Sequence, residues 1–142
     1  MRVVAGKYRG KNLVTPKDDS VRPTTTRIKE TLFNVLQGWV SGASVLDLFA
    51  GCGSLGIECI SRGAKDVTFV DRSKDSVSFV YQNLKGIDGE YRVVNADFAS
   101  VLRSSYVSGK KYDLIFLDPP YATMLGELAI DLIVELDLLS ED

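Results

Sequence analysis

The sequence predicts an α/β fold in which a largely parallel sheet is covered by helices on both faces. Three observations lead to this fold class. Strand-like and helix-like segments alternate along most of the chain, and the strand-like segments are almost continuously apolar, as in sheets covered on both sides. The 142 residues, 45% hydrophobic and 25% charged, fit a single globular core.

The amino-terminal part precedes this alternating pattern. Residues 1–14 read as short extended pieces around Gly6 and Gly10, which indicates a small β-ribbon. Between Pro23 and Val40 apolar residues recur at helical spacing, and this predicts a helix that packs against the body. The apolar residues of that helix are Ile28, Leu32, Phe33, Val35, Leu36 and Trp39.

The rest of the chain alternates regularly. Strands are predicted over 44–49, 66–71, 91–95 and 112–117, and helices over 54–62, 73–85, 98–105 and 123–138. Crossovers between parallel strands are right-handed, so functional loops should gather at the carboxyl ends of the strands. We expect residues 1–20 to form an amino-terminal extension and residues 21–142 to form the main domain.

Charge is distributed unevenly along the chain. Residues 1–29 contain eight basic and two acidic side chains, although the whole chain has a net charge of −2. A basic arm on an acidic body is suited to holding phosphates, with Lys7, Arg9 and Lys11 as candidate nucleic-acid contacts. A solvated charged surface would give the same pattern, so charge alone leaves both interpretations open.

Several functional classes are excluded by composition. The chain has no histidine, so it cannot contain a Ser-His-Asp triad, and Cys52 and Cys59 do not have metal-ligand spacing. We therefore expect no metal site. The first residues lack the apolar core of a secretory signal, and no apolar run has the length of a membrane span. A cytoplasmic protein without a membrane partner is expected.

A glycine-rich turn follows the first predicted strand of the main domain. Gly51, Gly53 and Gly56 satisfy the pattern G-x-G-x-x-G, and Asp71 follows Gly51 by 20 residues. Such a turn lets the backbone approach a ligand closely beneath a helix amino terminus, as in Rossmann-like folds. A nicotinamide dehydrogenase would show the same pattern.

Acidic residues favour S-adenosylmethionine over a dinucleotide at this turn. The Asp47 carboxylate would repel a pyrophosphate but suits a cofactor with an amino group and a sulfonium. Asp71 could accept the ribose hydroxyls, and Asp97 the adenine amino group. Each acid taken singly could instead be a helix cap. The predicted cofactor site comprises Asp47, Phe49, Ala50, Gly51, Gly53, Asp71, Asp97 and Phe98.

The most specific stretch is Asp118-Pro119-Pro120-Tyr121, which ends the last buried strand. A weakly nucleophilic amine on a base needs acceptors for its N–H bonds, which the Asp118 carboxylate and the Pro119 carbonyl could provide. Pro120 would stiffen the turn, and Tyr121 would offer a flat face to an unstacked base. A simple strand terminator would explain the prolines, but neither the acid nor the aromatic residue.

Together these motifs resemble those of class I methyltransferases with the N-methylase motif, and most closely those of the RsmD family. The resemblance covers four ordered blocks, which are residues 1–10, residues 22–27 with 30–34, residues 47–51 and residues 118–121. It implies methylation of the guanine N2 amine of 16S ribosomal RNA, with Arg22 and Thr24 on the substrate side. It also implies further strands beyond Asp142, so we expect the sheet to lack its carboxyl-terminal strands.

Other functions fit the same residues. The acceptor geometry would serve N6 of a DNA adenine or a protein glutamine, although the basic arm favours nucleic acid. A non-catalytic nucleotide- or RNA-binding module is an alternative of another class. We expect a monomer whose partner is ribosomal RNA or an assembling small ribosomal subunit.

Overall fold

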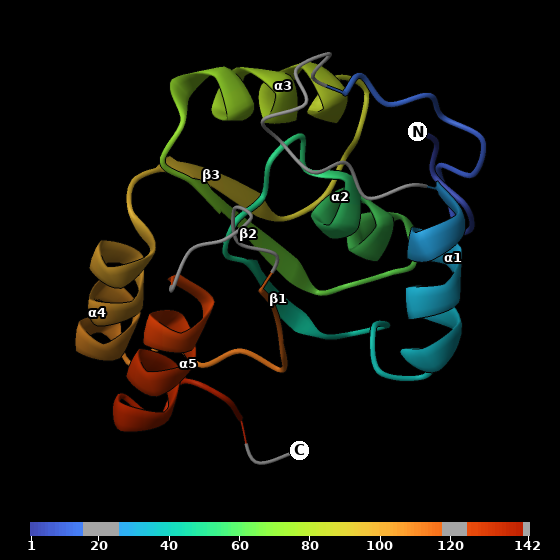
Figure 1. The fold of residues 1–142 in the computed structure, drawn as a ribbon. Coiled ribbons are helices and arrows are strands. Elements are labelled where there is room, and N and C mark those ends of the chain that lie inside the picture. The colour runs from blue at the N-terminus through green and yellow to red at the C-terminus, as the bar shows by residue number, and fades with distance from the viewer. Residues whose placement is uncertain (16–25, 118–124, 141–142) are drawn as a thin grey trace.

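The computed structural model describes residues 1–15, 26–117 and 125–140 and confirms the α/β fold (Figure 1). Four parallel strands form one sheet in the order β3-β2-β1-β4. In chain order the elements are α1 (Thr26–Val35), β1 (Ser44–Asp47), α2 (Ser54–Ser61), β2 (Asp66–Asp71), α3 (Lys74–Leu84), β3 (Tyr91–Asn95), α4 (Phe98–Ser108), β4 (Leu114–Phe116) and α5 (Leu125–Glu135).

The strand order defines where a ligand should bind. The chain proceeds outward from β1 to β2 and β3, and then returns to place β4 on the other side of β1. The direction of winding therefore reverses between β1 and β4, and ligands of open α/β sheets bind at the carboxyl ends of strands at such a reversal. The glycine-rich turn follows β1 directly.

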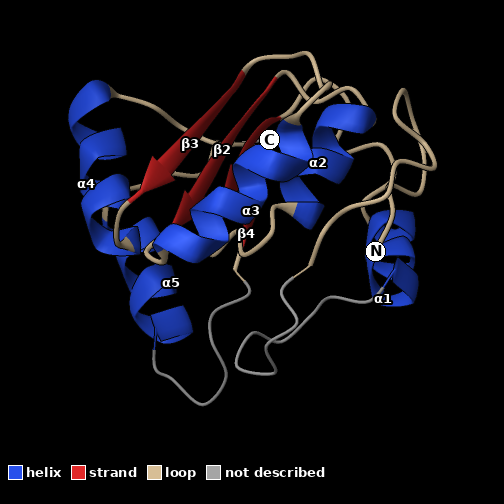
Figure 2. Ribbon diagram, turned by 90° about the horizontal axis from the view of Figure 1, so that it is seen from above, coloured by secondary structure: helices blue, strands red, loops and turns tan. Residues whose placement is uncertain are grey.

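Two apolar clusters cover the two faces of the sheet. Helices α1, α2 and α3 pack on one face, where Phe33, Ile57 and Val80 are fully buried. Helices α4 and α5 lie beside each other on the opposite face, where Leu102 and Ala129 are buried (Figure 2). Successive residues of each strand point to alternate faces, so strands covered on both sides must be apolar throughout.

Residues 1–15, which we call the N-terminal arm, form a shorter hairpin than the predicted β-ribbon. A single antiparallel bridge joins Arg2 and Asn12, while Val3 and Leu13 enter the core. Gly6, at a φ of 87°, turns the chain against helix α2, where a Cβ atom would overlap the Ser61 carbonyl. The N-terminal arm thus packs closely against α2 and forms only this one antiparallel bridge within the described residues.

The predicted bounds of β2 and β3 are confirmed, whereas helix α4 runs three residues beyond the predicted 98–105 and other predicted elements are longer than those observed. Helix α1 ends at Val35 within the predicted 23–40 span, and residues 36–39 form turns that precede β1. Strand β4 begins at Leu114 because Tyr112 pairs instead with Leu139, in an isolated bridge. Of the helices in the described ranges, none is long and apolar enough to cross a membrane.

Candidate functional site

The glycine-rich turn is a tight loop between β1 and α2 (residues 48–53), which we call the cofactor loop after the ligand predicted from the sequence. Gly51 and Gly53 have φ values of 59° and 85°, in the left-handed region that glycine adopts without strain. The Gly53 N–H donates to the Ala50 carbonyl at 2.8 Å, and α2 begins at the next residue. The loop therefore places the amino terminus of α2 at the carboxyl edge of the sheet.

Asp47 supports this loop from below. Its side chain is 2% exposed, and its Oδ2 accepts the Gly56 N–H in the first turn of α2 at 3.2 Å. A carboxylate at a helix amino terminus is stabilised by the helix dipole. Gly56 itself lies against β2, where a Cβ atom would overlap the Phe69 ring, so this glycine permits close contact between helix and sheet.

Asp71 closes the loop from the neighbouring strand. Its Oδ2 accepts the Gly51 N–H at 2.9 Å, and its Oδ1 accepts the Ser73 N–H at 2.9 Å. Asn95, at the end of β3, donates to the Asp71 carbonyl at 3.1 Å. The structure thus brings two predicted cofactor residues, Gly51 and Asp71, into direct contact.

The two predicted aromatic residues also meet. The rings of Phe49 and Phe98 lie 5.6 Å apart between centroids, at an interplanar angle of 43°. Asp97 is the N-cap of α4, where its side chain accepts the Ser100 N–H at 2.9 Å. The helix-cap interpretation is therefore confirmed for Asp97. Its neighbour Phe98 nevertheless contacts Phe49 of the cofactor loop.

The predicted catalytic residues Asp118, Pro119, Pro120 and Tyr121 lie outside the described residues. Two predicted substrate residues, Arg22 and Thr24, also lie outside them. The pairing of β4 with β1 shows where the described chain ends before this motif. Phe116, the last residue of β4, pairs with Asp47 at the end of β1, and the motif begins two residues later in the sequence.

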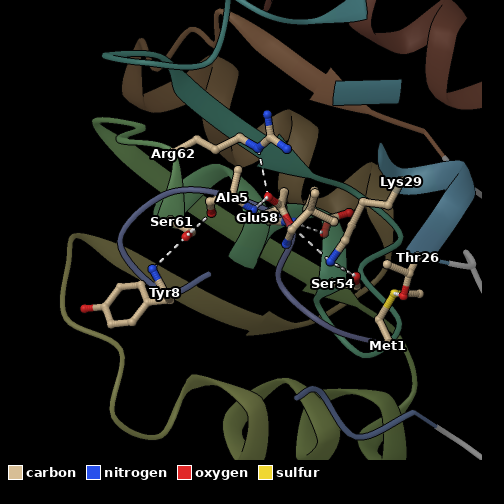
Figure 3. A network of polar contacts seen from close by, with 12 residues as sticks. Met1, Ala5, Tyr8, Thr26, Lys29, Ser54, Glu58, Ser61 and Arg62 are labelled. Atoms are coloured by element: carbon tan, nitrogen blue, oxygen red, sulfur yellow. Dashed lines mark hydrogen bonds and ion pairs between the residues drawn. The ribbon is translucent and has the colours of Figure 1, made fainter. Parts of the chain in front are cut away.

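A buried ionic cluster beneath the loop was not predicted from the sequence (Figure 3). Glu58 of α2 and Lys29 of α1 are fully buried, with the Lys29 Nζ 3.1 Å from Glu58 Oε1 and 3.0 Å from Ser54 Oγ. Arg62 Nε lies 2.8 Å from Glu58 Oε2. Lys29 therefore joins α1 to the first residue of α2, directly after the cofactor loop.

Glu58 remains ionised because several donors converge on it. Burial acts to raise the pKa of Glu58, but the Val4 N–H, Arg62 and Lys29 outweigh this and lower it. Burial lowers the pKa of Lys29, although the attraction of Glu58 opposes the shift. The i,i+4 pair of Glu58 and Arg62 was visible in the sequence, whereas the contact with Lys29 is between distant segments.

The same helix holds the N-terminal arm. Glu58 accepts the main-chain N–H groups of Val4 at 2.9 Å and Ala5 at 3.1 Å. The Ser61 hydroxyl donates to the Ala5 carbonyl at 2.6 Å and accepts the Tyr8 N–H at 2.9 Å. The arm is therefore fixed to the carboxyl end of α2, as Figure 3 shows.

The basic residues of the arm are not gathered at the cofactor loop. Lys7 and Arg9 are exposed, and the Lys7 N–H donates to the Ser61 carbonyl, one helix length from the loop. At 1.5 Å per residue, helix α2 separates the two regions by roughly 10 Å. Lys11 is half-buried, and its Nζ donates to the Lys85 carbonyl at the end of α3 at 2.9 Å.

Both cysteines are free thiols. Cys59 is fully buried, and burial raises the pKa of its thiol well above the usual range. Cys52 lies in the cofactor loop, and burial also raises the pKa of its thiol. Among the residues that the structure describes, no group of three or more histidine, cysteine or acidic side chains could hold a metal ion.

Comparisons with known proteins agree along the whole chain. The family model described as "Conserved hypothetical protein 95" matches residues 1–142. The ribosomal RNA small subunit methyltransferase D of Haemophilus influenzae is 38% identical over 95% of this chain and 71% of that protein. The protein of the same name from Escherichia coli K12 is 35% identical over 100% of this chain and 71% of that protein.

A solved structure shows the same fold. A hypothetical protein of Thermus thermophilus superposes with a TM-score of 0.87 at 28% identity, covering 99% of this chain and 80% of that one. The two proteins therefore share the arrangement of strands and helices as well as part of their sequence. By the family model and by both relatives, the chain belongs to the RsmD family, the family of ribosomal RNA small subunit methyltransferase D.

Proposed function

We propose that this protein transfers a methyl group from S-adenosylmethionine to the exocyclic N2 amine of a guanine in 16S ribosomal RNA. Ribosomal RNA methylation follows from membership of the RsmD family. The choice of guanine N2 rests on the resemblance of the motifs to that family. The single observation that carries the proposal is the position of the cofactor loop at the reversal of strand order between β1 and β4.

The polar groups of the loop and of the first turn of α2 support S-adenosylmethionine rather than a dinucleotide. The Gly51 and Gly56 N–H groups, which a pyrophosphate could use, already donate to the carboxylates of Asp71 and Asp47. A pyrophosphate would therefore meet two negative charges. S-adenosylmethionine carries no phosphate and supplies an electrophilic methyl group when bound. Asp71 is half-exposed at the strand end, where its carboxylate could accept ribose hydroxyls.

For the acceptor amine, we assign the chemistry to Asp118 and Pro119. Their carboxylate and carbonyl oxygens would accept the two N–H bonds, localise the nitrogen lone pair and stabilise the positive charge that develops on nitrogen. Tyr121 would stack on the base, and Pro120 would hold the turn rigid. No catalytic histidine is needed, in agreement with the composition of the chain.

The cofactor assignment is tested by calorimetric titration of S-adenosylmethionine, with NAD as the control ligand. Wild-type protein should bind S-adenosylmethionine and not NAD, and Asp71→Ala should abolish measurable binding. Asp75→Ala, which alters an exposed acid in the first turn of α3, is the matched control and should bind normally. Binding of NAD, or normal binding by Asp71→Ala, would contradict the assignment.

The catalytic assignment is tested by methyl transfer to 16S ribosomal RNA and to small ribosomal subunits. Asp118→Ala should lower the methylation rate by roughly 10²–10³-fold with little loss of cofactor affinity, as when one preorganised electrostatic partner is removed. Near-normal turnover by this variant would show that Asp118 is not the acceptor. Digestion of the product to nucleosides identifies the methylated base.

A further inference from the structure

Asn83, in the last turn of α3, is a buried polar residue that the cofactor and catalytic motifs do not include. Its side chain is 2% exposed and makes three hydrogen bonds to two segments distant in sequence. Its Nδ2 donates to the carbonyls of Val14 and Cys52, both at 2.9 Å. Its Oδ1 accepts the Val14 N–H at 2.8 Å. The complete side-chain amide is therefore engaged.

These three partners fix the orientation of the amide. Carbonyl oxygens only accept hydrogen bonds and an N–H only donates, so Nδ2 must face the Val14 and Cys52 carbonyls while Oδ1 faces the Val14 N–H. A rotation of the amide by a half-turn would break all three contacts. Neither a hydrophobic side chain of the same size nor an aspartate could replace them.

The two segments held by Asn83 belong to different parts of the proposed site. Cys52 lies between Gly51 and Gly53, the two left-handed residues of the cofactor loop, so its carbonyl direction depends on the conformation of that loop. Val14 lies near the end of the N-terminal arm. In the sequence, the arm continues directly toward Arg22 and Thr24, the residues assigned to the substrate side.

We propose that Asn83 is a positioning residue that couples cofactor binding at the loop to the position of the N-terminal arm. The inference rests on the proposed function, because it takes the loop as the S-adenosylmethionine site. A cofactor that orders the loop fixes the Cys52 carbonyl and thereby strengthens the hold of Asn83 on Val14. Linkage is reciprocal, so an arm fixed by RNA raises the affinity of the loop for cofactor by the same factor.

The first test compares two alanine variants that both loosen the arm. Asn83→Ala removes the contacts with Val14 and Cys52, whereas Ser61→Ala removes only those with Ala5 and Tyr8. We expect Asn83→Ala to weaken S-adenosylmethionine binding about tenfold, because the lost hydrogen bond leaves the partly buried Cys52 carbonyl without its donor. Ser61→Ala should weaken it less than about twofold, because its contacts do not reach the loop.

Thermal denaturation of both variants separates positioning from stability. If cofactor affinity falls in proportion to the melting temperature in both variants, Asn83 has only a structural role and the proposal is wrong. A selective loss in Asn83→Ala at a similar melting temperature supports it. These titrations contain no RNA, so their outcome does not depend on which nucleotide is methylated.

A second test uses the wild-type protein and therefore does not depend on the folding of a variant. Saturating S-adenosylmethionine should slow amide hydrogen exchange at Val14 several-fold, although the cofactor binds at the loop. Equal exchange with and without cofactor would overturn the coupling. A wild-type protein that binds no S-adenosylmethionine refutes the proposed cofactor and this inference together, whereas binding without protection of Val14 refutes this inference alone.

Discussion

The two ends of helix α2 differ in how their polar groups are used. At the amino end, glycines turn the cofactor loop, and carboxylates from β2 and β1 accept the N–H groups of Gly51 in the loop and Gly56 in the first turn of α2. At the carboxyl end, Glu58 and Ser61 accept four main-chain N–H groups of the N-terminal arm. The amino end is thus a tight turn at the sheet edge, and the carboxyl end is an internal anchor.

We expect this difference to separate stability from cofactor binding along one short helix. A buried charge is tolerated only when it is paired and fully hydrogen-bonded, as Glu58 is at the anchor. The loop has instead a tight backbone, with Gly51 and Gly53 at positive φ, which lets a ligand approach closely. Substitutions at the anchor should therefore lower the free energy of unfolding most, and those at the loop should chiefly affect cofactor binding.

The largest effect on stability is expected from Glu58→Ala. The substitution leaves Lys29 buried without its carboxylate partner, which should lower the free energy of unfolding by about 3–5 kcal/mol. Urea denaturation measures the change. The double variant Lys29→Met with Glu58→Leu is the control and should recover part of the loss, because the fully buried Lys29 charge is removed together with its partner. A loss below about 1 kcal/mol in Glu58→Ala would contradict the anchor.

Gly56→Ala should produce a smaller loss of stability and a larger loss of cofactor binding. The added methyl group would overlap the Phe69 ring and push α2 from β2, at a cost of about 1–3 kcal/mol. The shift would displace the cofactor loop, so titration should show weakened S-adenosylmethionine binding. Adding Phe69→Leu gives the methyl group space and should restore part of the binding. Unchanged affinity in Gly56→Ala would show that close packing does not position the loop.

Acid should weaken the anchor before it affects the apolar core. The pKa of Glu58 is lowered in the folded protein, so its contribution to stability is fully present above its ordinary pKa of 4.5. That contribution is lost as the pH falls through the lower, folded-state pKa. Urea denaturation between about pH 6 and pH 3 should therefore show a shallower decline for Glu58→Gln than for the wild type. Parallel declines would exclude Glu58 as a source of acid sensitivity.

The smallest effect on stability is expected from the exposed basic residues of the arm. Replacing Lys7 and Arg9 by alanine should leave the free energy of unfolding nearly unchanged but reduce the slope of log affinity for RNA against log salt by about 1–2. Arg103→Ala is the control, because it removes an exposed charge from α4 on the opposite face of the sheet. If the dependence of RNA affinity on salt is unchanged in the arm variant, Lys7 and Arg9 do not contact RNA.

Sequence patterns predicted the helices and strands better than the contacts between distant segments. The alternation of strands and helices was correct for the described residues, since hydrophobic periodicity reports directly which faces are buried. The N-terminal arm was predicted to pair as a ribbon, but it docks on α2 and retains one bridge. Local sequence could not show that a helix more than 50 residues away would take its hydrogen bonds.

In the candidate site too, some residues could be recognised from the sequence and others only from the structure. The glycine pattern and the acids at the strand ends were recognisable because their spacing is local, and the structure brings Asp71 to Gly51 and Phe49 to Phe98. Asn83 gave no such signal, because a single asparagine in a helix is ordinary in sequence. Its role is defined by two partners that lie 69 and 31 residues away along the chain.

The sequence by itself determined the α/β class, the glycine-rich turn after β1 and the family, because the motifs that indicate them consist of residues near one another in the chain. Only the tertiary structure decided which polar groups are buried together. Lys29 and Glu58 lie on different helices, and folding buries both charges as one ion pair. The free energy of burying a charge depends on partners that folding brings together, and chain spacing does not specify them.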